Sequence, residues 1–121
     1  MSFNTQSFKA ASASIPAYRI VQLSAANTVA LCASLTGYPL GITTDTVLTA
    51  GAGIPVQLDG ICKLYFNDSC AAGALVGSNT LGMGMPFAAV TSTTYAIGIL
   101  IGASVDKTGT IAEVLFKPVT R

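Results

Sequence analysis

Short apolar runs separated by turn-forming residues most restrict how this chain can fold. Such runs recur at intervals of about eight to twelve residues, the spacing typical of β-sandwiches and β-barrels. We expect strands at 18–23, 29–32, 40–48, 54–58, 61–66, 74–76, 87–90, 95–101 and 111–116. Only 69–76 leaves room for a helical turn. The pattern therefore predicts an all-β protein, a small antiparallel β-barrel or sandwich.

The first fourteen residues differ from the rest of the chain. They are polar or small apart from Phe3 and Phe8, and such a segment buries too little surface to offset its own ordering entropy. It is either disordered or an extended arm that orders against a neighbour through the two aromatic residues. We expect an N-terminal arm over residues 1–14 and a single β-domain over residues 15–121.

Charge is scarce in this sequence. Only 9% of the 121 residues are charged, whereas ordinary proteins have about a quarter, and 51% are hydrophobic. A soluble monomer of this size needs a larger charged share of its surface. We therefore expect other subunits or a partner to cover much of the surface.

The same charges argue against two classes of partner. Nucleic-acid binders cluster their cations, but the six Lys and Arg residues here are scattered singly. The uncharged stretch 69–105 is interrupted by glycines, a proline and runs of hydroxyl residues, so it does not read as a membrane-spanning helix. The first seventeen residues contain no apolar run typical of a secretory signal. We expect synthesis in the cytoplasm, with no direct nucleic-acid or membrane partner.

The residues that usually carry catalysis or metal binding are few. Histidine is absent, which removes the commonest general base and every His-containing metal site. The carboxylates are far apart in sequence and fit turn capping, since Asp side chains bond nearby backbone amides. Cys32, Cys62 and Cys70 lack the CxxC spacing of thiolate metal sites and read as buried free thiols. We expect no enzyme activity, no cofactor and no metal site.

Two features leave alternatives open. Leu40-Gly41-Ile42 followed by Val56-Gln57 resembles Ile97-Gly98-Ile99 followed by Val114-Leu115, which indicates either true internal symmetry or two ordinary hairpins. The segment 82–86, with Phe87, is either a simple loop or an interface whose thioethers adapt to a partner.

Seven segments in order resemble the capsid cement, or head decoration, proteins of tailed bacteriophages. They are 18–24 (YRIVQLS), 39–42 (PLGI), 50–53 (AGAG), 56–61 (VQLDGI), 72–76 (AGALV), 96–100 (AIGIL) and 109–115 (GTIAEVL). The resemblance spans most of the chain and implies a compact β-domain, a β-tulip being one form, often trimeric. It also implies a place outside an icosahedral shell of major capsid protein.

The resemblance supplies the expected function. We expect a virion structural protein on the capsid exterior that binds the major capsid protein and itself, as a homotrimer, and stabilises the shell against packaged DNA. The alternative is a host-surface or glycan-binding module of a tail or fibre. Six residues are the predicted capsid or oligomer contacts: Phe3, Phe8, Tyr18, Met83, Met85 and Phe87.

Overall fold

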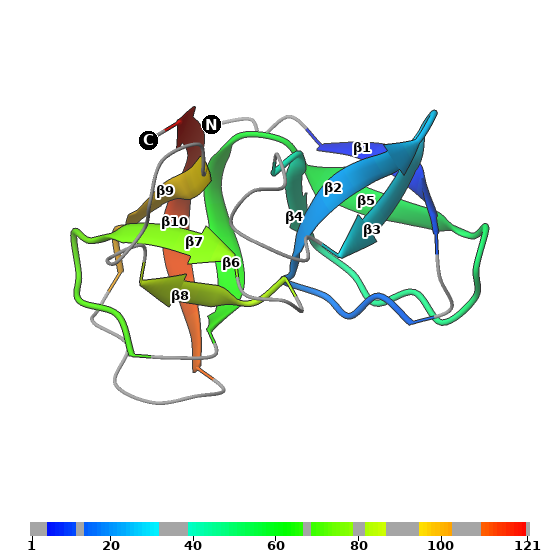
Figure 1. The fold of residues 1–121 in the computed structure, drawn as a ribbon. Coiled ribbons are helices and arrows are strands. Elements are labelled where there is room, and N and C mark those ends of the chain that lie inside the picture. Colours follow the sequence, from blue (N-terminus) through cyan, green and yellow to red (C-terminus); the bar gives the residue numbers. More distant parts are fainter. Residues whose placement is uncertain are drawn as a thin grey trace.

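The computed structural model describes residues 5–11, 14–31, 39–66, 69–78, 82–86, 95–102 and 110–120. These residues form ten strands and no helix, arranged as two closed five-stranded barrels side by side (Figure 1). The predicted all-β class is confirmed. Within the described ranges, no helix is long and apolar enough to cross a membrane.

The first barrel contains the first five strands. They are β1 (Thr5–Ala10), β2 (Ile20–Ala25), β3 (Thr28–Leu31), β4 (Gly41–Thr43) and β5 (Gly53–Gln57). Their order around the barrel is β1-β3-β2-β4-β5, and β5 pairs back onto β1. Only β1 and β3 run parallel among these neighbours; the other four pairs are antiparallel.

The second barrel contains the other five strands. They are β6 (Gly60–Phe66), β7 (Leu75–Ser78), β8 (Gly84–Pro86), β9 (Tyr95–Leu100) and β10 (Thr110–Thr120). Their order is β10-β6-β8-β7-β9, closed by the pairing of β9 with β10. Strand β8 lies in a stretch that we predicted to be a connection, whereas the predicted strand 87–90 lies outside the described residues.

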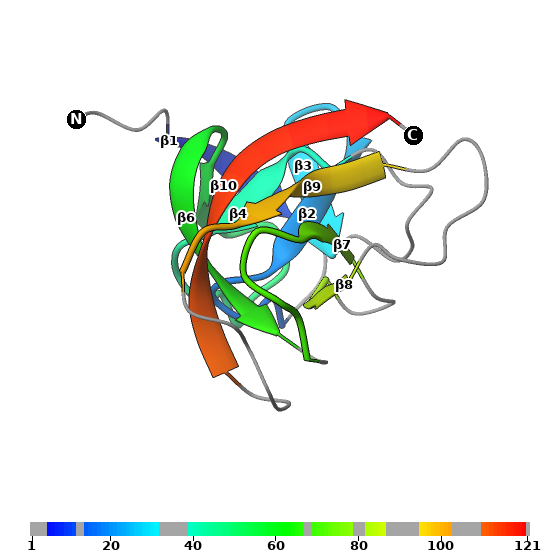
Figure 2. The same cartoon turned by 90° about the vertical axis from the view of Figure 1, so that its left-hand side faces the viewer.

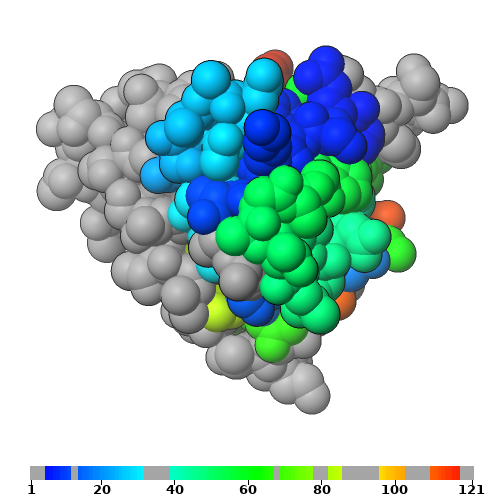
Figure 3. Space-filling model, turned by 90° about the vertical axis from the view of Figure 1, so that its right-hand side faces the viewer, coloured from blue at the N-terminus to red at the C-terminus, as the bar shows by residue number. Residues whose placement is uncertain are grey.

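The N-terminal segment differs from the predicted arm. Residues Thr5–Ala10 form β1, which pairs with β5 over five residues and closes the first barrel. Figure 3 faces this barrel and shows β1, in dark blue, at its surface. A strand held by backbone hydrogen bonds needs few apolar side chains; here only Ala10 is fully buried and Phe8 half-buried. Residues 1–4, 12 and 13 lie outside the described ranges.

The two barrels are internal repeats of each other. Strands β1 to β5 correspond in order to β6 to β10, and every neighbouring pair keeps its direction, including the single parallel pair of each barrel. The register corresponds as well: Val21 lies opposite Gly41 on β2 and β4, and Val76 lies opposite Gly98 on β7 and β9. The resemblance between residues 40–57 and residues 97–115 therefore reflects internal symmetry and not two unrelated hairpins.

Each barrel encloses its own core, but the second core crosses the boundary between them. The first core is built on buried residues such as Val29, Ile54 and Val56. The second contains Leu64, Phe66 and Val114 of its own barrel together with Ile20 and Ile42 from the first. Strand β5 ends at Gln57 and β6 begins at Gly60, so two residues separate the barrels. The prediction placed residues 15–121 in a single β-domain; the structure has two barrels joined by shared packing.

Candidate interaction surface

The outer side of the second barrel carries a group of exposed apolar side chains. Leu75 on β7 lies opposite Ile99 on β9, which lies opposite Leu115 on β10, which lies opposite Ile61 on β6. Leu75 and Ile99 are each 38% exposed. Figure 2 faces this side and shows β9 and β10 in front, with β6 and β7 on the two flanks. We call it the β9–β10 face; its residues are Ile61, Leu75, Ile99, Ile101, Ile111 and Leu115.

Alternation along the strands explains why these residues point outward. On β10 the side chains of Val114 and Phe116 are buried, so those of Glu113 and Leu115 point away from the core. On β6 Cys62 and Leu64 are buried, and Ile61 and Lys63 point outward in the same way. The outward positions therefore place apolar residues where a half-buried strand normally has polar ones.

The β9–β10 face also carries charged residues of both signs, Lys63, Glu113 and the exposed Lys117 that follows Leu115 and Phe116 on β10. Glu113 on β10 lies directly opposite Lys63 on β6, and both side chains are exposed. Directly opposite residues of an antiparallel pair have Cβ atoms about 5 Å apart. On β10 Glu113 lies between the outward positions of Ile111 and Leu115, so the charged pair is set among the apolar residues of the face.

A groove at the junction of the two barrels borders this face. It encloses about 560 Å³ and is lined by Tyr18 from the first barrel and by Lys63, Ile111 and Glu113 from the second, among others. A neighbouring hollow of about 420 Å³ shares Tyr18 and reaches Thr43 and Gln57. Tyr18 of the first barrel therefore lines both hollows.

Backbone hydrogen bonds fix Tyr18 in the groove. Its N–H donates to the Thr43 carbonyl oxygen at 2.9 Å, and its carbonyl oxygen accepts from the Tyr65 N–H at 3.0 Å, so it joins the two barrels. Its φ is 62°, a left-handed conformation that costs a non-glycine residue about 1 kcal/mol or more. The corresponding residue of the second barrel is Gly73, with φ 83° and the matching bond to Leu100 at 2.7 Å. A tyrosine thus occupies a position suited to glycine.

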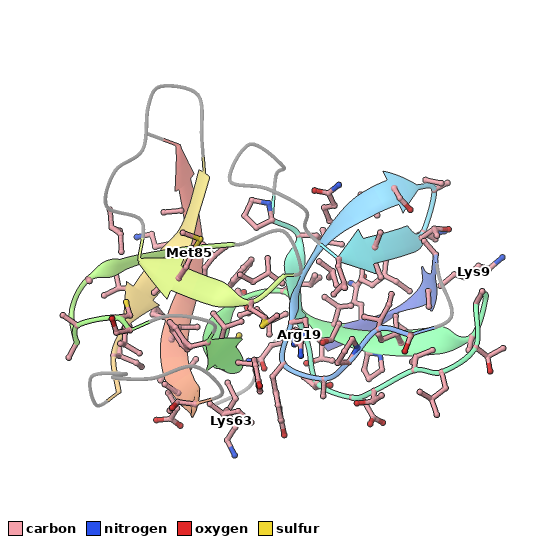
Figure 4. The ribbon with its side chains drawn as sticks, turned by 60° about the horizontal axis from the view of Figure 1, so that its bottom comes forward. Lys9, Arg19, Lys63 and Met85 are labelled. Atoms are coloured by element: carbon pink, nitrogen blue, oxygen red, sulfur yellow. The ribbon has the colours of Figure 1, made fainter. Side chains whose placement is uncertain are left out.

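Arg19 supports the same junction. Its guanidinium carbon lies 4.7 Å from the centre of the Tyr65 ring, a distance at which the cation is attracted to the ring face. Figure 4 shows Arg19 between the two barrels and Lys63 pointing outward. The Arg19 Nε atom is buried and has no hydrogen-bond partner among the described residues. The Arg19 cation therefore stays within the junction, whereas Lys63 is available at the surface.

Four of the six predicted contact residues lie within the described residues, and they are found in different places. Phe8 packs against the first core and Tyr18 lines the junction groove. Met83 and Met85 are half-buried near β8 in the second barrel, and Figure 4 labels Met85 there. Phe3 and Phe87 lie outside the described residues.

The β9–β10 face was not predicted from the sequence. Its signal was present in 95–101, where Ile99 and Ile101 alternate with the buried Leu100, so that apolar residues occupy both faces of one strand. A strand buried on both sides gives the same pattern, and only the register identifies the exposed side.

The cysteine and carboxylate side chains of the described residues are the remaining candidates for site chemistry. Among them no group of three or more Cys, Asp or Glu side chains could hold a metal ion. Cys62 and Cys70 are buried free thiols, in agreement with their interpretation from the sequence. Burial, and secondarily the Asp59 carboxylate, raises the pKa of Cys62 from 9.0 to about 12. The thiol therefore stays protonated at neutral pH and is a poor nucleophile.

The raised pKa predicts a pH dependence of stability. Above about pH 9 an unfolded chain releases the Cys62 proton while the folded chain keeps it, so alkali favours unfolding up to about pH 12. The contribution is constant below about pH 9 and then falls by at most about 1.4 kcal/mol per pH unit. Urea unfolding of the wild type and Cys62→Ala at about pH 8 and about pH 10.5 isolates this contribution. Equal losses in both proteins contradict the prediction.

Comparison with known proteins gives a match among solved structures but none among family models or curated proteins. Among solved structures, this chain is similar to the head fiber gp8.5 N base of bacteriophage phi29. The TM-score is 0.71 at 13% identity, over 96% of this chain and 95% of that one.

The two chains share one fold. The match covers nearly the whole of both chains, so it includes both barrels and not one barrel alone. At 13% identity the likeness concerns architecture, and the role of the phi29 protein is a property of that protein.

Proposed function

We propose that this protein is a bacteriophage virion structural protein that decorates the outside of the capsid. The observation that carries the proposal is the match over almost the full length of the chain to the head fiber gp8.5 N base of phage phi29. The ordered motifs that resemble capsid cement proteins support the same class independently, because they come from the sequence alone.

In this role the chain binds the icosahedral shell of major capsid protein and stabilises it against the pressure of packaged DNA. The two barrels are linked by two residues and a shared core, so they bind as one unit. In the proposed role this unit contacts neighbouring shell subunits. Many weak contacts of this kind add up through multivalency. The protein acts by binding, without catalysis or cofactor, and associates with itself as a homotrimer on the capsid exterior.

The test of this role is decoration of shells. Shells purified from a phage that lacks this chain should take up the protein to a fixed number of copies, and should then release DNA at a higher temperature. The gain arises because each bound copy adds free energy that must be lost before the shell opens. Shells that already carry the protein are the control and should take up none.

Two results count against decoration. Absence of binding to undecorated shells contradicts the proposal directly. Binding to glycans on an array, without binding to shells, favours the host-surface or glycan-binding alternative instead. The observation that favours this alternative is the junction groove, where the aromatic Tyr18 lies beside the charged residues Lys63 and Glu113.

A deletion of residues 1–14 does not test contact with the shell. It removes β1, which pairs with both β5 and β3 in the first barrel. Loss of binding after this deletion would follow from loss of the barrel itself. Point substitutions on the outer surface leave the barrels intact and are the better probe.

A further inference from the structure

Internal symmetry shows what the β9–β10 face corresponds to in the first barrel. Leu75 and Ile99 correspond to Ile20 and Ile42, since each pair lies opposite at the same register step of corresponding strands. Leu115, opposite Ile99, corresponds in the same way to Gln57, opposite Ile42. The same position in each repeat therefore carries an outward apolar pair.

In the first barrel this position is already a docking surface. Ile20 is 0% exposed and Ile42 is 1% exposed, and both belong to the core of the second barrel. The Ile20 N–H donates to the Gly82 carbonyl oxygen at 2.7 Å, and Gln57 Nε2 donates to the Ile61 carbonyl oxygen at 3.0 Å. Each of these contacts joins the first barrel to the second.

In the second barrel the corresponding residues are exposed. Leu75 and Ile99 are each 38% exposed, and neighbouring Ile101 and Ile111 are each 46% exposed. Four of the six large apolar residues that are exposed in the described part of the chain thus gather on this face. Contiguous exposed apolar patches of this kind mark interaction sites.

The charges on the face indicate which partner fits it. Lys63, Glu113 and Lys117 give the face charges of both signs, so it complements another face of the same composition. When two such faces meet around a symmetry axis, Lys63 of one copy approaches Glu113 of the next while the apolar centres pack together. Closed oligomers repeat one contact in this way.

We propose that the β9–β10 face is the self-association surface of this protein, and that this face of each copy meets the same face of its neighbours around the symmetry axis of the homotrimer. The inference rests on the self-association in the proposed function and names the residues that perform it. Ile99 and Leu115 form the apolar centre, and Lys63 and Glu113 set the relative orientation of the copies.

The apolar centre is tested by substitution of Ile99. Ile99→Asp places a charge at the centre of the contact and should weaken association at least about 30-fold, as loss of a central interface side chain does. Leu48→Asp is the matched control, because Leu48 is 74% exposed but lies outside the face. Sedimentation equilibrium and circular dichroism report association and folding. Equal association of wild type and Ile99→Asp, both folded, overturns the proposal.

The orientation is tested by exchange of charges between copies. Lys63→Glu makes positions 63 and 113 both acidic, and Glu113→Lys makes them both basic. Each variant alone should associate less than the wild type, because like charges meet. A mixture of the two should recover assembly and lose it again in high salt. A mixture that associates no better than its components overturns the proposed contact.

These measurements separate the inference from the proposed function. They use the protein alone in solution, without shells. A wild type that stays monomeric up to its solubility limit overturns self-association even if it decorates shells. Conversely, a protein that assembles through this face but leaves undecorated shells bare contradicts decoration only.

Discussion

Gly98→Ala is expected to destabilise the protein by at least about 3 kcal/mol, a large part of the about 5–15 kcal/mol that holds a typical domain folded. A Cβ atom at Gly98 would overlap the carbonyl oxygen of Leu115 and would lie 2.9 Å from its carbonyl carbon and 3.1 Å from the Lys117 nitrogen. All three are backbone atoms of β10, so relief requires movement of that strand. The φ of Gly98 is 152°, which L-residues rarely adopt.

The destabilisation should be confined to glycines whose Cβ position is blocked by atoms of a neighbouring strand. Gly41, the counterpart of Gly98, has its Cβ position blocked by the Gln57 carbonyl oxygen and by Val56 Cγ1, so Gly41→Ala should also be strongly destabilising. Gly53→Ala is the control: nothing lies within 4 Å of its Cβ position, and its expected effect is within about 1 kcal/mol. Urea unfolding measures all three variants. A Gly98→Ala protein as stable as Gly53→Ala contradicts the close approach of β9 to β10.

These two glycines also show how much of the fold could be predicted. Periodicity and turn residues gave the all-β class and the approximate positions of most strands, because alternation is a local property. The similarity around Gly41 and Gly98 indicated a repeat, but two hairpins give the same local pattern. The structure distinguishes the two explanations. The strand that contains Gly41 pairs with β2 and β5, and the strand that contains Gly98 pairs with the corresponding strands β7 and β10.

Other features could not be predicted because they depend on pairing between distant segments. Strand β1 is polar in sequence and is held by backbone pairing with β5. Backbone pairing leaves no mark on the amino-acid composition of a strand. Strand β8 has three residues, one of them Gly84, whose missing side chain leaves room for Leu64 and Phe66. Period-2 alternation identifies the buried side of a strand but not which of two cores receives it, so the division of the predicted β-domain into two barrels had no signal in the sequence.

The β9–β10 face is a different candidate surface from the contact residues predicted from the sequence, which stay a prediction. Scarcity of charge indicated that part of the surface is covered, since too few charged residues were available for a free monomer. The predicted contacts were aromatic residues and methionines, the usual interface types. The exposed group instead consists of aliphatic residues such as Leu75 and Ile99, whose side chains are also the commonest core residues and therefore gave no signal.

Ile42→Ala is expected to lower the free energy of unfolding by about 3 kcal/mol, the usual cost of deleting a buried isoleucine side chain. Ile42 lies on β4 of the first barrel but packs in the core of the second. Its loss should therefore destabilise both barrels in one transition. Ile54→Ala removes the same atoms from the first core and should lower the free energy of unfolding in that same single transition. Leu48→Ala, at a position 74% exposed, should have almost no effect.

The alternative is that the barrels unfold separately, and its signature is distinct. In that case the backbone amides of β1 to β5 in Ile42→Ala would lose their protection from native-state hydrogen exchange. The amides of β6 to β10 would keep theirs. We expect the opposite for two reasons. Ile20 and Ile42 complete the second core, and the Tyr65 N–H and the Gly82 carbonyl oxygen bond to Tyr18 and Ile20 of the first barrel. An unfolded first barrel would leave that core open and these groups unpaired, at a cost that makes the half-folded state rare.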